Sequence, residues 1–270
     1  MELVKEALKL RDSLLRGTST NISPVHWQYG SIARLGTNDT IDKLLDNGYS
    51  SISLGFIGLY ECTLAIKGVS HTTSNGKEFA INVLKHLNDK VNDWKTEDGL
   101  HGCSLYSTPS ESLCYKFALK TRKRFGEIKN ITDKDWFTNS YHVSVYEPID
   151  AFSKLEFEGE LQQYSKGGCV SYVEMPDLQN NLEALSEVVE CIYNNNIYAE
   201  INLTGGDYCG ECGFSGEMQI DEKGKWVCPH CGSHDTNKMS ISRRICGYIN
   251  SATEINAGKM QEFKNRVKHL

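Results

Sequence analysis

Hydrophobic and polar positions alternate with two different periods along most of this chain. Apolar residues three and four apart predict helices over residues 2–16, 77–95, 110–124 and 178–194. Short runs rich in β-forming residues predict strands over residues 51–55, 103–107, 138–146, 168–174 and 197–203. Because the two kinds of segment alternate, we expect an α/β fold with a largely buried sheet.

The pattern changes after Gly205-Gly206. From there the chain consists of short turns, cysteines and glycines, and only residues 257–269 have the pattern of a basic amphipathic helix. We therefore expect two domains, an α/β domain over residues 1–204 and a separate metal-stabilised module over residues 205–270.

Composition and charge exclude several function classes. The chain has 270 residues and a formal net charge of −6, which disfavours a general nucleic-acid-binding role, because phosphate binding requires a basic surface. No apolar run is long enough to cross a membrane, and the charged N-terminus lacks the core of a signal peptide. These features predict a cytoplasmic protein.

Four of the ten cysteines form two tight pairs. Cys209 and Cys212 make one CxxC pair, and Cys228 and Cys231 make the other, with fifteen residues between the pairs. This spacing predicts a tetrahedral site for Zn²⁺, with a rubredoxin-type iron site as the alternative. Four thiolates leave no open coordination position, so the site is expected to be structural.

The remaining polar and sulfur-containing candidates have no such spacing. We expect five scattered cysteines to be core or near-core residues, namely Cys62, Cys103, Cys114, Cys169 and Cys191. His142 and Glu174 lie near strand ends, and we interpret both as structural rather than catalytic residues.

A glycine-containing segment, Arg243-Arg244-Ile245-Cys246-Gly247-Tyr248-Ile249, follows the second cysteine pair, and an Asn-x-Gly-Lys stretch follows at residues 256–259. With the cysteine pairs, this order resembles the C-terminus of the anaerobic (class III) ribonucleoside-triphosphate reductases. Four upstream blocks resemble the same family: SISLGFIGLYE (51–61), SLYSTPSES (104–112), TDKDWFTNSYHV (132–143) and GGCVSYVEMP (167–176).

The resemblance implies radical chemistry centred on Gly247. In this family an activating enzyme, which carries a 4Fe–4S cluster and uses S-adenosylmethionine, removes a hydrogen atom from the loop glycine. A backbone radical at Cα is stabilised by the flanking amides when the residue is flat, and glycine has no side chain to hinder this. The stored radical oxidises an active-site cysteine to a thiyl, which abstracts the 3′ hydrogen of a ribonucleoside triphosphate, and formate commonly supplies the reducing equivalents.

The resemblance also implies a fold and an assembly. The family fold is a ten-stranded α/β barrel of the glycyl-radical-enzyme type, and the blocks in this chain correspond to its second half. The thiyl cysteine lies upstream of that half. We therefore expect the chain to need an N-terminal reductase segment for activity, and the assembled enzyme to be a homo-oligomer.

Thr108-Pro109-Ser110-Glu111 has the form of a helix start, with Thr108 as N-cap and Glu111 completing a capping box. One interpretation is that this segment only begins a helix. The other is that its N–H groups bind substrate phosphate, as helix N-termini can. Other classes of ribonucleotide reductase have a similar turn at such a site. In the second interpretation the substrate contacts are Ser107, Thr108 and Ser110.

Two other functions remain open on the sequence. A non-catalytic zinc-ribbon binding protein would be expected to carry basic residues beside the cysteine pairs. Acidic residues surround the pairs here, among them Glu211, Glu217, Asp221 and Glu222, although Lys223 and Lys225 weaken the point. A glycyl-radical spare-part subunit would need only the terminal module, whereas this chain has some two hundred residues before it.

Overall fold

The computed structural model describes residues 1–46, 48–107, 110, 112–176, 178, 180–203, 206–245, 248–251 and 256–269. The chain folds into two compact units. The first comprises Met1–Gly55, Asn82–Tyr106 and Tyr164–Gly168, and the second comprises Phe56–Ile81, Ser107–Gln163 and Cys169–Leu270. Helix α5 (Ser74–Thr96) begins in the second unit and continues into the first.

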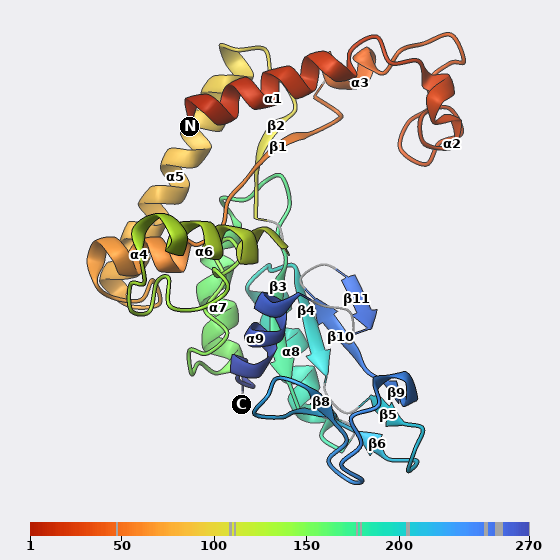
Figure 1. Ribbon diagram of the computed structural model, residues 1–270. Coiled ribbons are helices and arrows are strands. Elements are labelled where there is room, and N and C mark those ends of the chain that lie inside the picture. Colours follow the sequence, from red (N-terminus) through yellow and green to blue (C-terminus); the bar gives the residue numbers. More distant parts are fainter. Residues whose placement is uncertain are drawn as a thin grey trace. The chain divides into compact units, whose positions relative to one another are not determined.

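The first unit combines helices with one parallel pair of strands (Figure 1). Its helices are α1 (Glu2–Leu15), η1 (Thr20–Ile22), α2 (Pro24–Trp27) and α3 (Asp42–Asp46), together with most of α5. Strands β1 (Ile52–Gly55) and β2 (Cys103–Tyr106) pair in register from Ile52↔Cys103 to Gly55↔Tyr106. Leu84, Val91 and Trp94 of α5 are buried at the helical spacing expected for residues 77–95.

The second unit contains a βαβ arrangement. Strand β3 (Ser171–Met175) is followed by helix α8 (Leu182–Asn194) and by strand β4 (Ala199–Leu203), which pairs parallel to β3. Helix α7 (Ala151–Gln162) packs with α8 on the face of β3 that carries Val173. Leu155, Val173, Val188 and Ile197 are buried together in this core. The architecture is therefore mixed α/β, as the sequence predicted.

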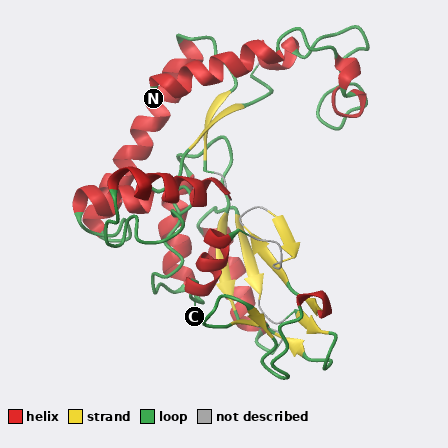
Figure 2. Ribbon diagram, viewed as in Figure 1, coloured by secondary structure: helices red, strands yellow, loops and turns green. Residues whose placement is uncertain are grey.

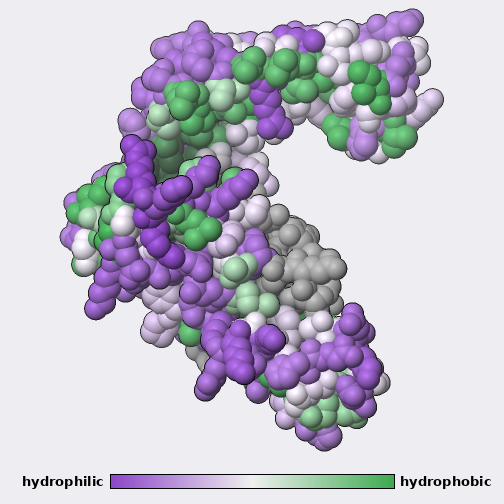
Figure 3. Space-filling view, viewed as in Figure 1, coloured by the Kyte–Doolittle hydropathy of each residue, from purple (hydrophilic) through white to green (hydrophobic). Residues whose placement is uncertain are grey.

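Two further helices of this unit precede α7. Helix α4 (Leu59–Lys67) begins after Gly58 and ends before Gly68, both of which have positive φ values. Helix α6 (Ser112–Phe125) confirms the helix predicted over 110–124, and it buries Cys114 and Ala118. Its opposite face exposes Lys116, Lys120, Lys123 and Arg124, and Figure 3 shows hydrophilic residues gathered over this helix.

The strand predicted over residues 138–146 is wrong. This segment is a loop with one isolated bridge, Ile57↔Asn139. Ser140 has φ = 32°, which an extended strand cannot accommodate. The hydrogen-bonding groups of Thr138 bond to α4 and its start: N and Oγ1 donate to Glu61, and the carbonyl accepts from Gly58 N. The β-forming side chains of this segment are therefore buried although the segment does not belong to a sheet.

Short strands and loops make up most of the chain after β4 (Figure 2). These elements are β5 (Asp207–Cys209), β6 (Ser215–Gly216), β7 (Gln219–Ile220), β8 (Trp226–Val227), η2 (Thr236–Lys238), β9 (Met239–Ser240), β10 (Ser242–Ile245), β11 (Tyr248–Ser251) and helix α9 (Ala257–Asn265). Strand β5 pairs antiparallel with β6 and β9, while β7 pairs with β8. None of the helices in the described part of the chain has the length and apolar character of a membrane span.

Candidate functional site

The four paired cysteines are held by two equivalent turns. The N–H of Gly213 donates to the carbonyl oxygen of Cys209 (2.8 Å), and the N–H of Gly232 donates to that of Cys228 (2.9 Å). Both glycines have positive φ values, 75° and 71°, which side-chain-bearing residues rarely adopt. The glycine after each CxxC pair is therefore needed to reverse the chain around the thiols.

The four sulfur atoms converge on one point. All of them lie within 4.8 Å of one another, with Sγ–Sγ distances of 3.8 Å between Cys209 and Cys231 and 3.7 Å between Cys212 and Cys228. Four thiolates around a zinc ion at its usual bond length would be about 3.8 Å apart. The predicted residues are thus brought together in a geometry that could hold a tetrahedral metal ion.

A small hydrophobic core surrounds this cluster. Met218, Trp226, Met239 and Ile241 are buried with Cys209 and Cys228, and Phe214, Ile220 and Met260 pack against them. The side chain of Asp207 accepts a hydrogen bond from Met218 N at 2.8 Å. A core this small is of the kind that a structural metal site commonly stabilises.

A two-stranded hairpin follows the cysteine module. Strands β10 and β11 pair antiparallel from Ser242↔Ser251 to Ile245↔Tyr248. Cys246 and Gly247, which join the two strands in the sequence, lie outside the described residues. The geometry of the glycine therefore stays a prediction, while the paired strands on both sides of it are described.

The proposed phosphate contacts are only partly described. Ser107 is buried and forms a parallel bridge with Cys169. Ser110 N donates to Asn139 Oδ1 at 2.9 Å, so this amide already has a partner at the start of α6. Thr108, Pro109 and Glu111 lie outside the described residues.

Four of the five scattered cysteines agree with the expected placement. Cys103 and Cys114 are buried, and Cys169 and Cys191 are partly buried. Cys62 is an exception, because its position on α4 is exposed. The expectation rested on the general tendency of free cysteines to be buried, but α4 turns this position outward.

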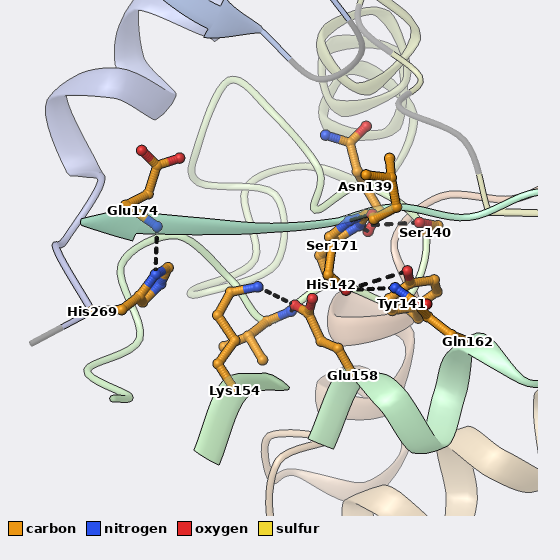
Figure 4. A network of polar contacts seen from close by, with 12 residues as sticks. Asn139, Ser140, Tyr141, His142, Lys154, Glu158, Gln162, Ser171, Glu174 and His269 are labelled. Carbon is orange, nitrogen blue, oxygen red and sulfur yellow. Dashed lines mark hydrogen bonds and ion pairs between the residues drawn. The ribbon is translucent and has the colours of Figure 1, made fainter. Parts of the chain in front are cut away.

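A buried polar network lies between β3, α7 and the loop at 138–146 (Figure 4). Lys154 Nζ contacts Glu158 Oε1 one helical turn away, and Val143 N donates to the same oxygen at 2.9 Å. Burial alone would raise the pKa of Glu158, but the nearby charge of Lys154 outweighs it and lowers the pKa to about 2. An ionised carboxylate is thus held inside the protein.

His142 lies in the same network. Its Nε2 faces the carbonyl oxygen of Val170 at 2.8 Å, and its Nδ1 lies 3.0 Å from the carbonyl oxygen of Asn139 and 3.1 Å from the Ser140 hydroxyl. The ring stacks against Tyr141 and Tyr172. Burial lowers the pKa of His142, so the imidazole is neutral near pH 7.

Glu174 joins this network to the end of the chain. Its carboxylate accepts from Asn202 Nδ2 (2.8 Å) and from Arg266 Nη1 (2.7 Å). Its backbone N–H donates to His269 Nδ1 at 2.9 Å, and its carbonyl accepts from His269 N at 2.9 Å. Burial and the nearby Lys154 lower the pKa of His269 to about 3.

These groups surround a small cavity of about 50 Å³. Its wall includes Trp136, Asn139, His142, Lys154, Tyr172, Glu174, Asn202, Glu262, Arg266 and His269. Sequence reasoning identified only His142 and Glu174 among them. The sequence carried only a weak signal for Lys154. Asp150 has the side chain of a helix N-cap, which the structure confirms, and Lys154 and Glu158 follow with the spacing of one helical turn.

Comparisons with known proteins agree on one family. The model of the family described as anaerobic ribonucleoside-triphosphate reductase matches residues 1–269. The chain is 40% identical over 275 residues to such a reductase of Haemophilus influenzae and 39% identical over 272 residues to that of Enterobacteria phage T4. It spans 38% and 43% of the lengths of these two relatives.

Solved structures show the same fold at lower identity. An anaerobic ribonucleotide reductase superposes with a TM-score of 0.64 at 20% identity, covering 82% of this chain and 34% of that one. The enzyme of Thermotoga maritima in complex with dATP and CTP gives 0.61 at 17% identity, covering 98% and 39%.

Proposed function

Because the chain belongs to the anaerobic ribonucleoside-triphosphate reductase family, we propose that it is the C-terminal portion of such a reductase, storing a radical at Gly247 that is used to make deoxyribonucleotides. In this proposal, residues 1–204 form the second half of a ten-stranded α/β barrel. Residues 205–270 form a zinc module together with the radical loop.

One observation carries the proposal: a four-thiol cluster is followed, after η2 and β9, by a hairpin whose two strands are joined in the sequence by Cys246 and Gly247. A small core surrounds the cluster, and Ile241, the residue before β10, is buried in that core. The chain therefore enters the hairpin from a rigid base. The strand that leads to the radical position would therefore start from a packed core at Ile241.

Glycine is the only residue type suited to this role at position 247. A radical at Cα is stabilised by delocalisation into the two flanking peptide groups, which requires a flat residue, and a Cβ atom would hinder it. We propose that a radical-SAM activating enzyme, with its own 4Fe–4S cluster and S-adenosylmethionine, removes one hydrogen atom from this Cα.

Zn²⁺ is the ion we propose for the cysteine cluster. Cys209, Cys212, Cys228 and Cys231 would supply all four ligands, and their sulfur spacing fits the tetrahedral geometry that zinc prefers. When bound, the ion would join the two CxxC turns and take no part in the reaction. Cys209 at the end of β5 and Cys228 directly after β8 are buried in the same cluster as Trp226.

The rest of the reaction needs groups outside this chain. We propose that an N-terminal segment supplies the cysteine that becomes a thiyl, that ribonucleoside triphosphate is the substrate, and that formate is the reductant. Ser107, Thr108 and Ser110 are the proposed substrate contacts at the start of α6. The assembled enzyme is proposed to be a homo-oligomer.

Electron paramagnetic resonance of the assembled enzyme tests the proposal. After anaerobic treatment with the activating enzyme and S-adenosylmethionine, we expect a doublet, because a glycyl radical keeps one Cα hydrogen. Exposure to air should then cut the chain at residue 247, and mass spectrometry should detect the C-terminal fragment.

Gly247→Ala should abolish both the doublet and the cleavage while leaving the metal content unchanged. Gly206→Ala is the matched control, because a Cβ there would meet no atom within 4 Å. A doublet and the same cleavage in the Gly247→Ala variant would show that the radical is elsewhere.

A further inference from the structure

The Asn-x-Gly-Lys stretch at residues 256–259 has no role in the chemistry proposed above, yet it starts helix α9 with three specific contacts. Asn256 caps the helix, its Oδ1 accepting from Lys259 N at 2.9 Å. Lys259 is buried, and its ammonium group contacts Glu262 Oε2 at 2.5 Å. A fully buried ion pair in a nine-residue helix indicates that this helix is docked on other elements.

Gly258 forms a close contact between α9 and other elements. A Cβ added at this position would lie 2.6 Å from the carbonyl oxygen of Asp135 and 2.6 Å from Cδ2 of Tyr115, which belongs to α6. Both distances are shorter than van der Waals contact allows, so only glycine lets the backbone of α9 approach α6 this closely. Gln261 Oε1 accepts from Asp135 N at 2.7 Å and completes the contact.

The residues after α9 dock on β3. Arg266 donates to Glu174 at 2.7 Å and to Glu262 at 3.0 Å. His269 makes two hydrogen bonds with the backbone of Glu174, and Val267 N donates to Val145 O at 2.9 Å. The end of the chain is therefore held to β3 at Glu174 and to the preceding loop at Val145.

The same helix also contacts the cysteine module. Met260 packs against the core around Cys209 and Trp226. Lys264 Nζ donates to the carbonyl oxygen of Glu222 at 3.0 Å, and the Lys268 side chain pairs with Glu217 at 2.8 Å. Helix α9 thus touches α6, the loop at Asp135 and the cysteine module, all within the second unit (Figure 1).

We propose that α9 and residues 266–269 are a clamp that positions the radical hairpin, with Gly258 and Arg266 as its positioning residues. Among the described strands, β10 and β11 pair only with each other, so no sheet fixes their place. Their place is set by what precedes and follows them in sequence: Ile241 in the module core, α9 on α6, and Arg266 and His269 on Glu174 of β3. The claim that the clamp positions the radical rests on the proposed function. The docking of α9 on α6 and of Arg266 and His269 on β3 does not depend on it.

Hydrogen exchange of the zinc-loaded chain tests the docking. Gly258→Ala should speed exchange of the backbone amides of α9 about tenfold or more, because the added Cβ has to displace backbone and ring atoms. Arg266→Gln should speed exchange over 266–269 similarly, because it leaves Glu174 without its cation and removes one of the two cations that pair with Glu262. Amides of α8 should be unaffected.

Asn265→Ala is the matched control, because it changes an exposed residue of the same helix. Its exchange should equal that of the unchanged chain. Exchange in Gly258→Ala that is no faster than in Asn265→Ala would overturn the docking contact.

Product formed per radical tests the positioning. In the assembled enzyme the spin yield of Gly258→Ala should stay within about twofold of the unchanged enzyme, whereas deoxyribonucleotide formed per spin should fall about tenfold or more, because hydrogen-atom transfer is steeply sensitive to a displacement of about 1 Å. A merely structural helix would lower stability without changing product per spin in the molecules that remain folded.

The two proposals can fail separately. Absence of a doublet in the unchanged assembled enzyme would overturn the proposed function, and the exchange experiment would still decide the docking. A normal doublet together with unchanged product per spin in Gly258→Ala would overturn the positioning role alone.

Discussion

Replacing Lys154 by methionine tests the buried ion pair beside the cavity. The Lys154 and Glu158 side chains are 5% and 0% exposed, and they lie one turn apart on α7. Methionine has nearly the length of lysine and no charge, so the cavity left is small. The main effect of Lys154→Met is therefore to leave the Glu158 carboxylate inside the protein, with Val143 N as a hydrogen-bond donor but no cation.

The expected loss of stability is large. Removing one partner of a buried pair typically costs about 3–5 kcal/mol. The pKa of Glu158, about 2 in the folded chain, gives a similar value, since its difference from the ordinary value of 4.5 corresponds to about 3 kcal/mol. The double variant Lys154→Met with Glu158→Gln removes both charges and keeps the acceptor for Val143 N. It should cost only about 1–2 kcal/mol.

The dependence on pH gives a second test with a definite sign. In the unchanged chain the folded pKa of Glu158 is depressed, so its stabilising contribution is present above pH 4.5 and is lost as the pH falls towards 2. In Lys154→Met, burial without the cation should raise that pKa above its ordinary value. The penalty of the substitution should then be smaller at pH 5 than at pH 8.

Urea denaturation followed by tryptophan fluorescence is a suitable assay, because Trp136 in the same region is 1% exposed. The unchanged chain, both single variants and the double variant form a thermodynamic cycle at each pH. Equal losses in Lys154→Met and in the double variant would show that the charge of Lys154 does not offset the burial of Glu158. A penalty that grows as the pH falls would refute the same reasoning.

Three further outcomes follow from the contacts described above. Cys228→Ser should abolish metal binding and loosen the terminal module to proteolysis, measured by elemental analysis and digestion, whereas stoichiometric metal in this variant would contradict the four-ligand site. Gly159→Ala should destabilise the chain by about 1–3 kcal/mol, because its Cβ would lie 2.8 Å from Ile197 Cδ1. Adding Ile197→Ala should relieve that clash, so a purely additive loss in denaturation would count against it. Because burial lowers the pKa of His142, its contribution is present above about pH 6.5 and is lost as the pH falls, and His142→Gln should flatten that part of the stability–pH profile.

The sequence by itself determined features that depend on neighbouring residues. The thiols of each CxxC pair and the glycine after it lie within five positions. Each turn is therefore formed by neighbouring residues, and the spacing alone predicted both turns. The helix over 77–95 was equally clear, because Ala80, Leu84 and Val91 repeat on one side of a helix whose other side is polar.

Helix α7 was missed for the opposite reason. It buries Lys154, Glu158 and Gln162 as well as its apolar residues, so no polar stripe marks a solvent face. For residues 138–146 the sequence predicted a strand that the structure does not contain. The β-branched and aromatic residues of this segment are buried by contacts to α4 and β3, and Glu61, 77 positions before Thr138, supplies the hydrogen bonds that a neighbouring strand would have given.

Only the tertiary structure decided what surrounds the cavity and what holds the end of the chain. Glu174 meets Arg266 and His269, which follow it by 92 and 95 positions, and Gly258 meets Asp135 across more than a hundred. No local pattern encodes such pairs, because a charge or a glycine looks the same in sequence whether it faces water or another element. Sequence therefore determined which groups are present and their local turns, whereas the packing of α9 on α6 and of the residues after it on β3 decided which groups meet.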